Sequence, residues 1–198
     1  QYASKPSRNS PMIYLNDHLD QLDVEHALSL LSEQRRQQAL AFKHDLGRRT
    51  CVAAYLLLCE GLQREFGIIE PPVFSYGEHG KPFIVGHPDI CFNMSHCREA
   101  AICVIDSHPV GVDIESMRGY REALVRHTMS DDEMLQIGQS ANPELEFVRL
   151  WTMKEAVQKR SGEGIRSDMK SVLDGAGRVD TVVSADQRYV YSVAYSDQ

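Results

Sequence analysis

Three stretches of the chain have the spacing of apolar and polar residues that is typical of helices. Residues 28–42 form a charged segment that carries Ala and Leu, residues 48–66 contain no proline, and residues 143–159 form the third stretch. The second stretch is apolar on most of its faces, so we expect a core helix that ends at Gly67. Ser130 and Glu133 have the spacing of a capping box and predict a short helix over 131–138.

Short runs rich in β-branched and aromatic residues predict strands. One lies at 12–15, and three follow closely at 89–96, 100–108 and 109–115, with polar turn residues between them. We expect these three to form an antiparallel sheet. Residues 76–82 are rich in turn formers, and a closing hairpin is predicted from 179–183 and 189–195.

The order of elements, helices and then strands, occurs twice along the chain. This order predicts an α+β (α/β) fold made of two similar halves, each a small antiparallel sheet packed with helices. We place the N-terminal half at residues 1–109 and the C-terminal half at residues 110–198.

The charge balance limits the partners that the whole molecule attracts. The 198 residues contain 21 Lys and Arg against 28 Asp and Glu, a formal net charge of −7, so a polyanion needs a local basic cluster. We therefore expect neither nucleic acid nor a membrane surface as a partner. No apolar stretch approaches the ~20 residues that cross a bilayer, and the first twelve residues lack the apolar core of a signal peptide, which predicts a cytoplasmic protein.

The five cysteines form no CxxC pair, which favours reduced thiols over a disulfide framework. A zinc site is an alternative, but its candidate ligands match no structural zinc spacing. These candidates are Cys91, His96, Cys97 and Cys103.

Two carboxylates two residues apart mark the segment Gly111-Val112-Asp113-Ile114-Glu115. On a strand, Asp113 and Glu115 project from one face while the apolar residues face the core. Neighbouring carboxylates repel each other unless solvent, a proton or a cation lies between them, and a hard divalent ion such as Mg²⁺ suits them. The alternative is a solvated strand face.

A second candidate segment is Trp151-Thr152-Met153-Lys154-Glu155-Ala156, followed by Lys159. In a helix, Glu155 and Lys159 share a face at i and i+4, so Glu155 is a candidate third carboxylate for the metal. The alternative is an ordinary Glu–Lys surface pair with Trp151 as a core anchor.

Ser95 and His96 end the predicted strand Phe92-Asn93-Met94-Ser95-His96. A hydrolase relay between them is not expected, because the G-x-S-x-G elbow is absent and adjacent strand residues point to opposite faces. Both groups are instead candidates for holding a phosphate.

Four motifs in order, GKP, FNMSH, GVDIE and WTMKEA with a lysine four residues after its glutamate, resemble one family. The segment 42–164 is similar to the phosphopantetheinyl transferases of the surfactin-synthetase-activating type. The resemblance implies a pseudo-dimer of two α/β halves, with coenzyme A and Mg²⁺ in the cleft between them. It also implies transfer of 4'-phosphopantetheine to a serine of an apo acyl or peptidyl carrier protein, with release of adenosine 3',5'-bisphosphate.

The resemblance assigns roles residue by residue. The implied metal ligands are Asp113, Glu115 and Glu155. The implied coenzyme A contacts are Arg48, Lys81, Pro82, Ser95, His96, Lys154 and Lys159, with Arg49 as the alternative to Arg48 for the 3'-phosphate. The implied catalytic groups are Glu155 as general base, with Lys159 and His96 assisting the leaving group. Arg35 and Arg36 are candidates to replace the N-terminal lysines of the family.

Two other classes of function stay open. A module that binds coenzyme A without catalysis would need a defect among the carboxylates, and a metal-dependent phosphohydrolase would not call for the lysines and the GKP turn together. By analogy we expect a monomer. A carrier protein, commonly acidic, would need a local basic or apolar patch, for which the candidates are Met117, Arg118, Tyr120, Arg121, Arg126 and Met129.

Overall fold

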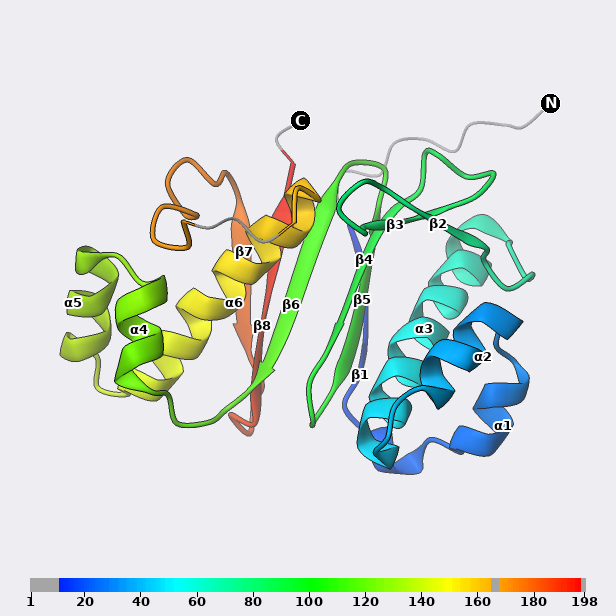
Figure 1. Ribbon diagram of the computed structural model, residues 1–198, viewed down its shortest axis with the longest axis horizontal. Coiled ribbons are helices and arrows are strands. Elements are labelled where there is room, and N and C mark those ends of the chain that lie inside the picture. The colour runs from blue at the N-terminus through cyan, green and yellow to red at the C-terminus, as the bar shows by residue number, and fades with distance from the viewer. Residues whose placement is uncertain (1–10, 165–167, 197–198) are drawn as a thin grey trace.

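Two antiparallel sheets pack face to face, and helices cover the outer face of each (Figure 1). The computed structural model describes residues 11–164 and 168–196, so the ends of both predicted halves lie partly outside the described residues. Ile102 and Val104 from one sheet meet Val112, Ile114 and Val193 from the other in a buried apolar layer. The predicted α+β class is confirmed, whereas the division at residues 109 and 110 stays a prediction.

The first sheet has the strand order β1-β5-β4. It consists of β1 (Met12–Asn16), β5 (Ala101–Asp106) and β4 (Cys91–His96), with antiparallel pairing throughout. On its outer face lie η1 (Leu19–Gln21), α1 (Val24–Ser29), α2 (Glu33–Leu40) and α3 (Asp45–Phe66). A separate hairpin joins β2 (Phe74–Tyr76) to β3 (Pro82–Ile84).

The helix predicted over 28–42 is two helices. The chain leaves α1 at Leu30, and Ser32 starts α2 by accepting the backbone N–H of Arg35 at its side chain. Serine favours such a cap over a helix interior, which explains the break. The core helix is confirmed and ends at Gly67 in the left-handed conformation.

The second sheet has the strand order β6-β8-β7. It consists of β6 (Val110–Ser116), β8 (Tyr189–Tyr195) and β7 (Val179–Val183). Its helices are α4 (Glu122–Thr128), α5 (Asp131–Gln139) and α6 (Pro143–Ser161). The capping box at Ser130 and Glu133 is confirmed, since each side chain accepts the backbone N–H of the other residue.

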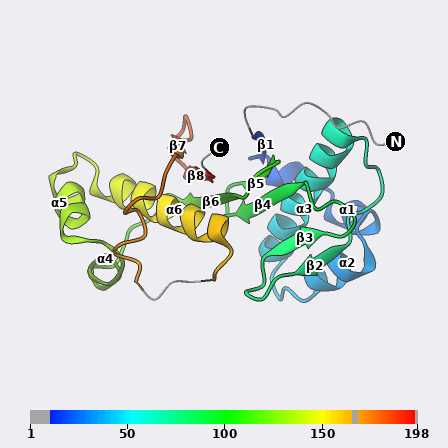
Figure 2. The same cartoon turned by 90° about the horizontal axis from the view of Figure 1, so that it is seen from above.

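The expectation that β4, β5 and β6 form one sheet is wrong. β6 pairs along its whole length with β8, from Val110 opposite Tyr195 to Ser116 opposite Tyr189. Seen from above, β4 and β6 nevertheless lie side by side at the junction of the two sheets (Figure 2). The chain thus changes sheets between β5 and β6, and polar residues from both sheets meet at this junction.

Gly111 sets the distance between β6 and α6. A Cβ atom at this position would lie 2.0 Å from the carbonyl oxygen of Ala156 and 2.4 Å from the backbone nitrogen of Arg160. Only glycine allows so close an approach. The close packing brings the α6 residues after Thr152 against the outer face of β6, where Asp113 lies.

None of the described helices is long and apolar enough to cross a membrane.

Candidate functional site

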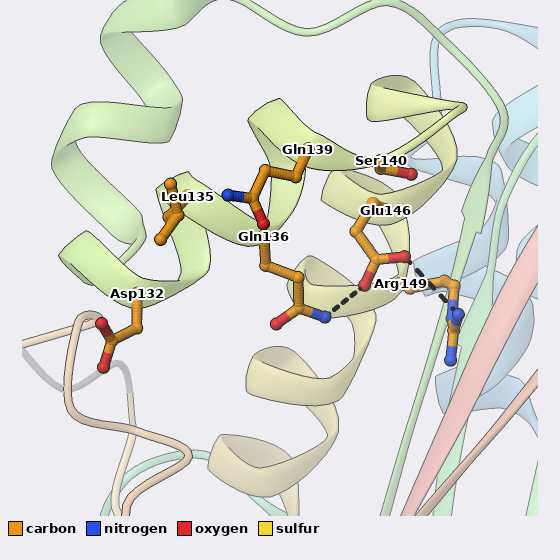
Figure 3. A pocket seen from close by; sticks show the side chains of 7 residues that line it. All are labelled: Asp132, Leu135, Gln136, Gln139, Ser140, Glu146 and Arg149. Carbon is orange, nitrogen blue, oxygen red and sulfur yellow. Dashed lines mark hydrogen bonds and ion pairs between the residues drawn. The ribbon is translucent and has the colours of Figure 1, made fainter.

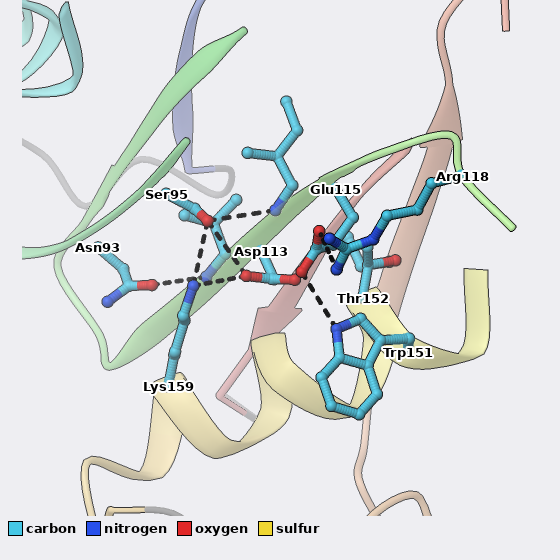
Figure 4. Close-up of polar contacts among 11 residues, drawn as sticks. Asn93, Ser95, Asp113, Glu115, Arg118, Trp151, Thr152 and Lys159 are labelled. Carbon is cyan, nitrogen blue, oxygen red and sulfur yellow. Dashed lines mark hydrogen bonds and ion pairs between the residues drawn. The ribbon is translucent and has the colours of Figure 1, made fainter. Parts of the chain in front are cut away.

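Asp113, Ser95 and Lys159 form the centre of a polar cluster at the junction of β4, β6 and α6 (Figure 4). The ammonium of Lys159 donates to Asp113 Oδ1 at 2.6 Å and to Ser95 Oγ at 3.1 Å. Ser95 in turn donates to the same carboxylate oxygen at 3.1 Å. Asp113 is only 5% exposed, so this ion pair is screened little by solvent.

Glu115 lies two residues along β6 on the same face, as predicted. Its Oε1 accepts the indole N–H of Trp151 at 3.2 Å, and Arg118 lies 3.4 Å from Oε2. Partial burial and the charge of Asp113 raise the pKa of Glu115, against the opposing influence of Arg118. The indole is therefore both a core anchor and a group that orients this carboxylate.

Glu155 extends from α6 toward the same region. Burial raises its pKa, and the charges of Asp113 and Glu115 raise it further, while Lys159 lowers it. These mutual effects indicate that the three carboxylates lie in one region of the fold. The structure thus places the three predicted metal ligands in the same region, with Lys159 paired to Asp113.

The donor set of this cluster fits a hard divalent cation. Asp113 Oδ2 is buried and accepts no hydrogen bond, which leaves one negatively charged oxygen available for a ligand. Carboxylate oxygens are the ligands that Mg²⁺ prefers. As placed in the described part of the chain, no three His, Cys, Asp or Glu side chains could hold an ion, so Mg²⁺ binding requires these carboxylates to converge.

His96 follows Ser95 at the end of β4. Burial lowers its pKa, and the cations of Lys159 and Arg35 lower it further, against Asp113. The imidazole is thus neutral near pH 7 until an anion offsets those cations. Arg35 lies over the rings of Tyr55 and Phe74, with its guanidinium carbon 5.1 Å and 5.7 Å from their centroids.

The contacts of Arg35, Arg36 and Arg49 differ, although all three are arginines of the N-terminal half. Arg36 is exposed and paired with Glu33, whereas the Nε atom of Arg35 is buried without a partner. Arg49 is used in the fold, because its guanidinium donates to the carbonyls of Leu19 and Leu22 at 2.9 and 2.8 Å.

Of the adjacent arginines Arg48 and Arg49, Arg48 is the one whose guanidinium has donors without a described partner. Its Nε is buried without a partner, and its one described hydrogen bond is a 3.4 Å contact with the Phe42 carbonyl. These contacts favour Arg48 over Arg49 as an anion ligand.

Lys81 closes the junction at the end of α6. Its ammonium donates to the carbonyls of Arg160 at 2.8 Å and Val110 at 3.3 Å, which ties the β2–β3 hairpin to the second half. Burial lowers the pKa of Lys81. Pro82 follows it as the first residue of β3. Lys81 therefore lies at the C-terminal end of α6, where it contacts the residue that follows Lys159.

Lys154 is not part of this cluster. Its side chain is fully buried, and its ammonium lies 2.9 Å from Glu133 Oε1 and donates to the Met169 carbonyl at 2.7 Å. Glu133 is the capping-box residue of α5, so Lys154 connects α5, α6 and the segment that follows them. The enclosed ammonium thus links α6, the helix that carries Glu155, to α5 and to the segment at Met169.

Met129 and a hollow between α5 and α6 both lie outside the polar cluster. Met129 is fully buried, so the expectation that it contributes to an exposed docking patch is wrong; it packs under α4 with Val125. A hollow of about 460 Å³ between α5 and α6 is lined by Asp132, Leu135, Arg149 and their neighbours (Figure 3). It contains none of the residues of the polar cluster.

Sequence patterns did not reveal the roles of Trp151 and Arg118 toward Glu115. The sequence predicts Trp151 only as a core anchor and Arg118 only as a candidate for the carrier-docking patch. The spacing of Glu115 and Arg118, three residues apart across the end of a strand, was the available signal. The indole contact joins residues 36 positions apart, so no local pattern could have predicted it.

Comparison with known proteins agrees with the four motifs. Residues 109–195 match the model of the 4'-phosphopantetheinyl transferase superfamily. A 4'-phosphopantetheinyl transferase of Bacillus subtilis is 27% identical over 164 residues, which cover 80% of this chain and 72% of that protein. The 4'-phosphopantetheinyl transferase Sfp of Bacillus subtilis strain 168 is 29% identical with the same coverage. The 4'-phosphopantetheinyl transferase gsp of Aneurinibacillus migulanus is 33% identical over 113 residues, 56% of this chain and 47% of that protein.

Proposed function

The chain belongs to the 4'-phosphopantetheinyl transferase superfamily, and on this premise we propose a Mg²⁺-dependent transfer from coenzyme A to an apo acyl or peptidyl carrier protein. The enzyme is a transferase, and coenzyme A is its co-substrate. The observation that carries the proposal is that Asp113, Glu115 and Glu155 lie close enough to influence one another electrostatically, with Lys159 paired to Asp113 at the junction of the two sheets.

The reaction exchanges a phosphoanhydride bond of coenzyme A for a phosphoester bond to the carrier serine. The serine oxygen of the carrier forms a bond to the β-phosphorus of coenzyme A, and the bond from that phosphorus to the bridging oxygen breaks. The serine proton must leave, and adenosine 3',5'-bisphosphate departs with the bridging oxygen. Three tasks follow for the protein: to neutralise the pyrophosphate, to accept the proton and to stabilise the leaving group.

Glu155 is the candidate for accepting the proton. Its raised pKa makes it a stronger base than an ordinary carboxylate, because burial and the neighbouring acids disfavour its charged form. Lys159 has an ammonium on the same helix face, one turn on, which would stabilise charge on the departing phosphate. His96, neutral until an anion binds, would donate a hydrogen bond there.

The carboxylates of Asp113, Glu115 and Glu155 would hold Mg²⁺, which supplies charge neutralisation at the pyrophosphate when bound. Without a cation, Asp113 retains its one buried oxygen without a partner. Trp151 and Arg118 each contact one oxygen of the Glu115 carboxylate. These contacts fix the orientation of the side chain, as residues behind a metal ligand commonly do.

The 3'-phosphate and adenine are assigned to the N-terminal half. The spare guanidinium donors of Arg48 and the buried Nε of Arg35 support a 3'-phosphate site there. We place the adenine near Lys81 and Pro82. The carrier would dock beside α4, where Arg121 is exposed at the N-cap and Arg118 and Arg126 are about 70% exposed.

The decisive experiment is to incubate the protein with an apo carrier, coenzyme A and Mg²⁺ and to measure the mass of the carrier. Transfer adds one phosphopantetheine to the carrier, and a carrier with its serine replaced by alanine gains nothing. Hydrolysis would consume coenzyme A and leave the carrier unchanged, and a binding module would alter neither. Either of those two results would overturn the proposal, and carriers from fatty-acid, polyketide and nonribosomal-peptide systems should all be tried.

A further inference from the structure

One edge of β6 pairs with β8, and along its other edge side chains of β4 take the place of a strand partner. Val112 donates its backbone N–H to Asn93 Oδ1 at 2.8 Å, and Ile114 donates its own to Ser95 Oγ at 3.3 Å. Within the described residues, β4 and β6 belong to different sheets and share no backbone pairing. Two acceptors two residues apart on one strand thus match two donors two residues apart on the other.

This contact fixes the orientation of the Asn93 carboxamide. A backbone N–H can only donate, so the oxygen of the carboxamide must face Val112 and the NH₂ group must point away from β6. Figure 4 shows the carboxamide of Asn93 with its oxygen toward the side of Asp113 and its nitrogen on the opposite side. The side chain is 8% exposed, and its NH₂ group donates no hydrogen bond to any described residue.

Ser95, in contrast, has used its full hydrogen-bonding capacity. Its hydroxyl donates to Asp113 and accepts from Ile114 and Lys159. A hydroxyl has one donor and two acceptor positions, so none remains for a ligand in this arrangement. At this junction, the donors that no described residue uses are therefore the NH₂ group of Asn93, on the side away from β6, and the third ammonium proton of Lys159.

We infer that Asn93 is a substrate-binding residue whose oriented NH₂ group donates a hydrogen bond to a pyrophosphate oxygen of coenzyme A. This inference rests on the proposed function and adds an uncharged, fixed donor to it. The same side chain holds β6 through Val112 and so links substrate binding to the strand that carries Asp113. Ser95 then acts as a positioning residue for Asp113 and Lys159 rather than as the principal phosphate contact.

The test separates the two ends of the carboxamide. Asn93→Asp keeps an oxygen for Val112 and removes the NH₂ donor, whereas Asn93→Leu removes both. Asn16→Asp is the matched control, because the Oδ1 of Asn16 also accepts a backbone N–H, that of His18 at 2.9 Å, on the remote strand β1. Melting temperature and the Kd for coenzyme A are measured for each variant at low and raised salt.

The expected result is that Asn93→Asp melts below the wild type, because it adds a charge to a buried side chain, but above Asn93→Leu, because it keeps the contact with Val112. It should bind coenzyme A about tenfold or more weakly, as the loss of a hydrogen bond to a charged group predicts. Raised salt screens a charge at this buried position only in part, so Asn93→Leu, which adds no charge, must show a similar weakening for the loss to be assigned to the donor. Asn93→Leu should lose both affinity and melting temperature, and Asn16→Asp neither.

Wild-type affinity of Asn93→Asp at raised salt would overturn the inference and leave Asn93 as a structural link. The proposed function has a separate criterion, since it fails only if the wild-type protein does not modify any apo carrier. A wild type that transfers phosphopantetheine while Asn93→Asp binds coenzyme A normally would therefore remove the inference alone.

Discussion

Lys159 Nζ and Asp113 Oδ1 lie 2.6 Å apart, although the residues are 46 positions apart in the chain and come from α6 and β6. Each depends on the other, since Asp113 is almost completely buried and Lys159 is about one-third exposed. Removing one partner of such a pair leaves the other charge without compensation. The pair is therefore the point at which the fold and the proposed chemistry meet.

The first prediction concerns this pair. Asp113→Asn should lower kcat/KM for carrier modification by about 100-fold or more and weaken Mn²⁺ binding, because the variant removes a proposed metal ligand and the counter-charge of Lys159. Kinetics with an apo carrier and titration calorimetry with Mn²⁺ measure both effects. The exposed Asp132→Asn in the hollow between α5 and α6 is the control and should behave as wild type; equal activity in the two variants would contradict the assignment.

The second prediction separates Arg48 from Arg49. Arg48→Met should weaken the binding of coenzyme A about tenfold and leave 3'-dephospho-coenzyme A unaffected, because its guanidinium has spare donors for the 3'-phosphate. Arg49→Met should instead destabilise the fold by about 2 kcal/mol, since two backbone carbonyls lose their donor. Calorimetric binding and thermal unfolding provide the two measurements. The reverse assignment is supported if the two phenotypes are exchanged.

The third prediction tests the close approach of β6 and α6. Gly111→Ala should destabilise the protein by about 3 kcal/mol or more, because the new methyl group would overlap the backbone of Ala156 and Arg160. Gly138→Ala in α5 is the control: nothing lies within 4 Å of its Cβ position, and the change should stabilise the helix by about 0.5–1 kcal/mol. Urea unfolding gives both values, and a neutral Gly111→Ala would mean that β6 and α6 separate freely.

The fourth prediction concerns the pH dependence of stability. Because the pKa of Glu155 is raised in the folded protein, the native state keeps this proton to a higher pH than the unfolded chain does. As the pH rises from the unfolded to the folded pKa of Glu155, the free energy of unfolding therefore falls, and the full loss is reached above the folded pKa. In metal-free buffer at neutral pH, Glu155→Gln should thus melt at a higher temperature than the wild type, while its transfer activity is lost.

The same comparison at acid pH provides the control. The advantage of Glu155→Gln should shrink as the pH falls toward the unfolded carboxyl pKa of about 4.3, where both proteins are neutral at this position. A difference in melting temperature that does not change between neutral and acid pH would assign the effect to packing instead of charge.

Much of the fold was predictable from local patterns. The period of the apolar residues determined the core helix that ends at Gly67, the capping box determined the start of α5, and the alternation around Asp113 determined which face its side chain occupies. These features depend on residues within one or two turns of each other, so the sequence contains all the information they need. The ordered motifs likewise identified the family.

The choice of partners across the chain was decided only by the tertiary structure. Lys154 and Lys159 have the same chemistry in sequence, as do Arg48 and Arg49. Yet Lys154 and Arg49 bond to backbone carbonyls of the scaffold, whereas Lys159 pairs with Asp113 and the Nε of Arg48 has no partner among the described residues. Which residue of each pair is used in the scaffold depends on the direction of each side chain from its helix and on distant carbonyls and carboxylates. The transfer of β6 to the second sheet, and with it the contact from Asn93 to Val112, follows from long-range strand pairing that no local period encodes.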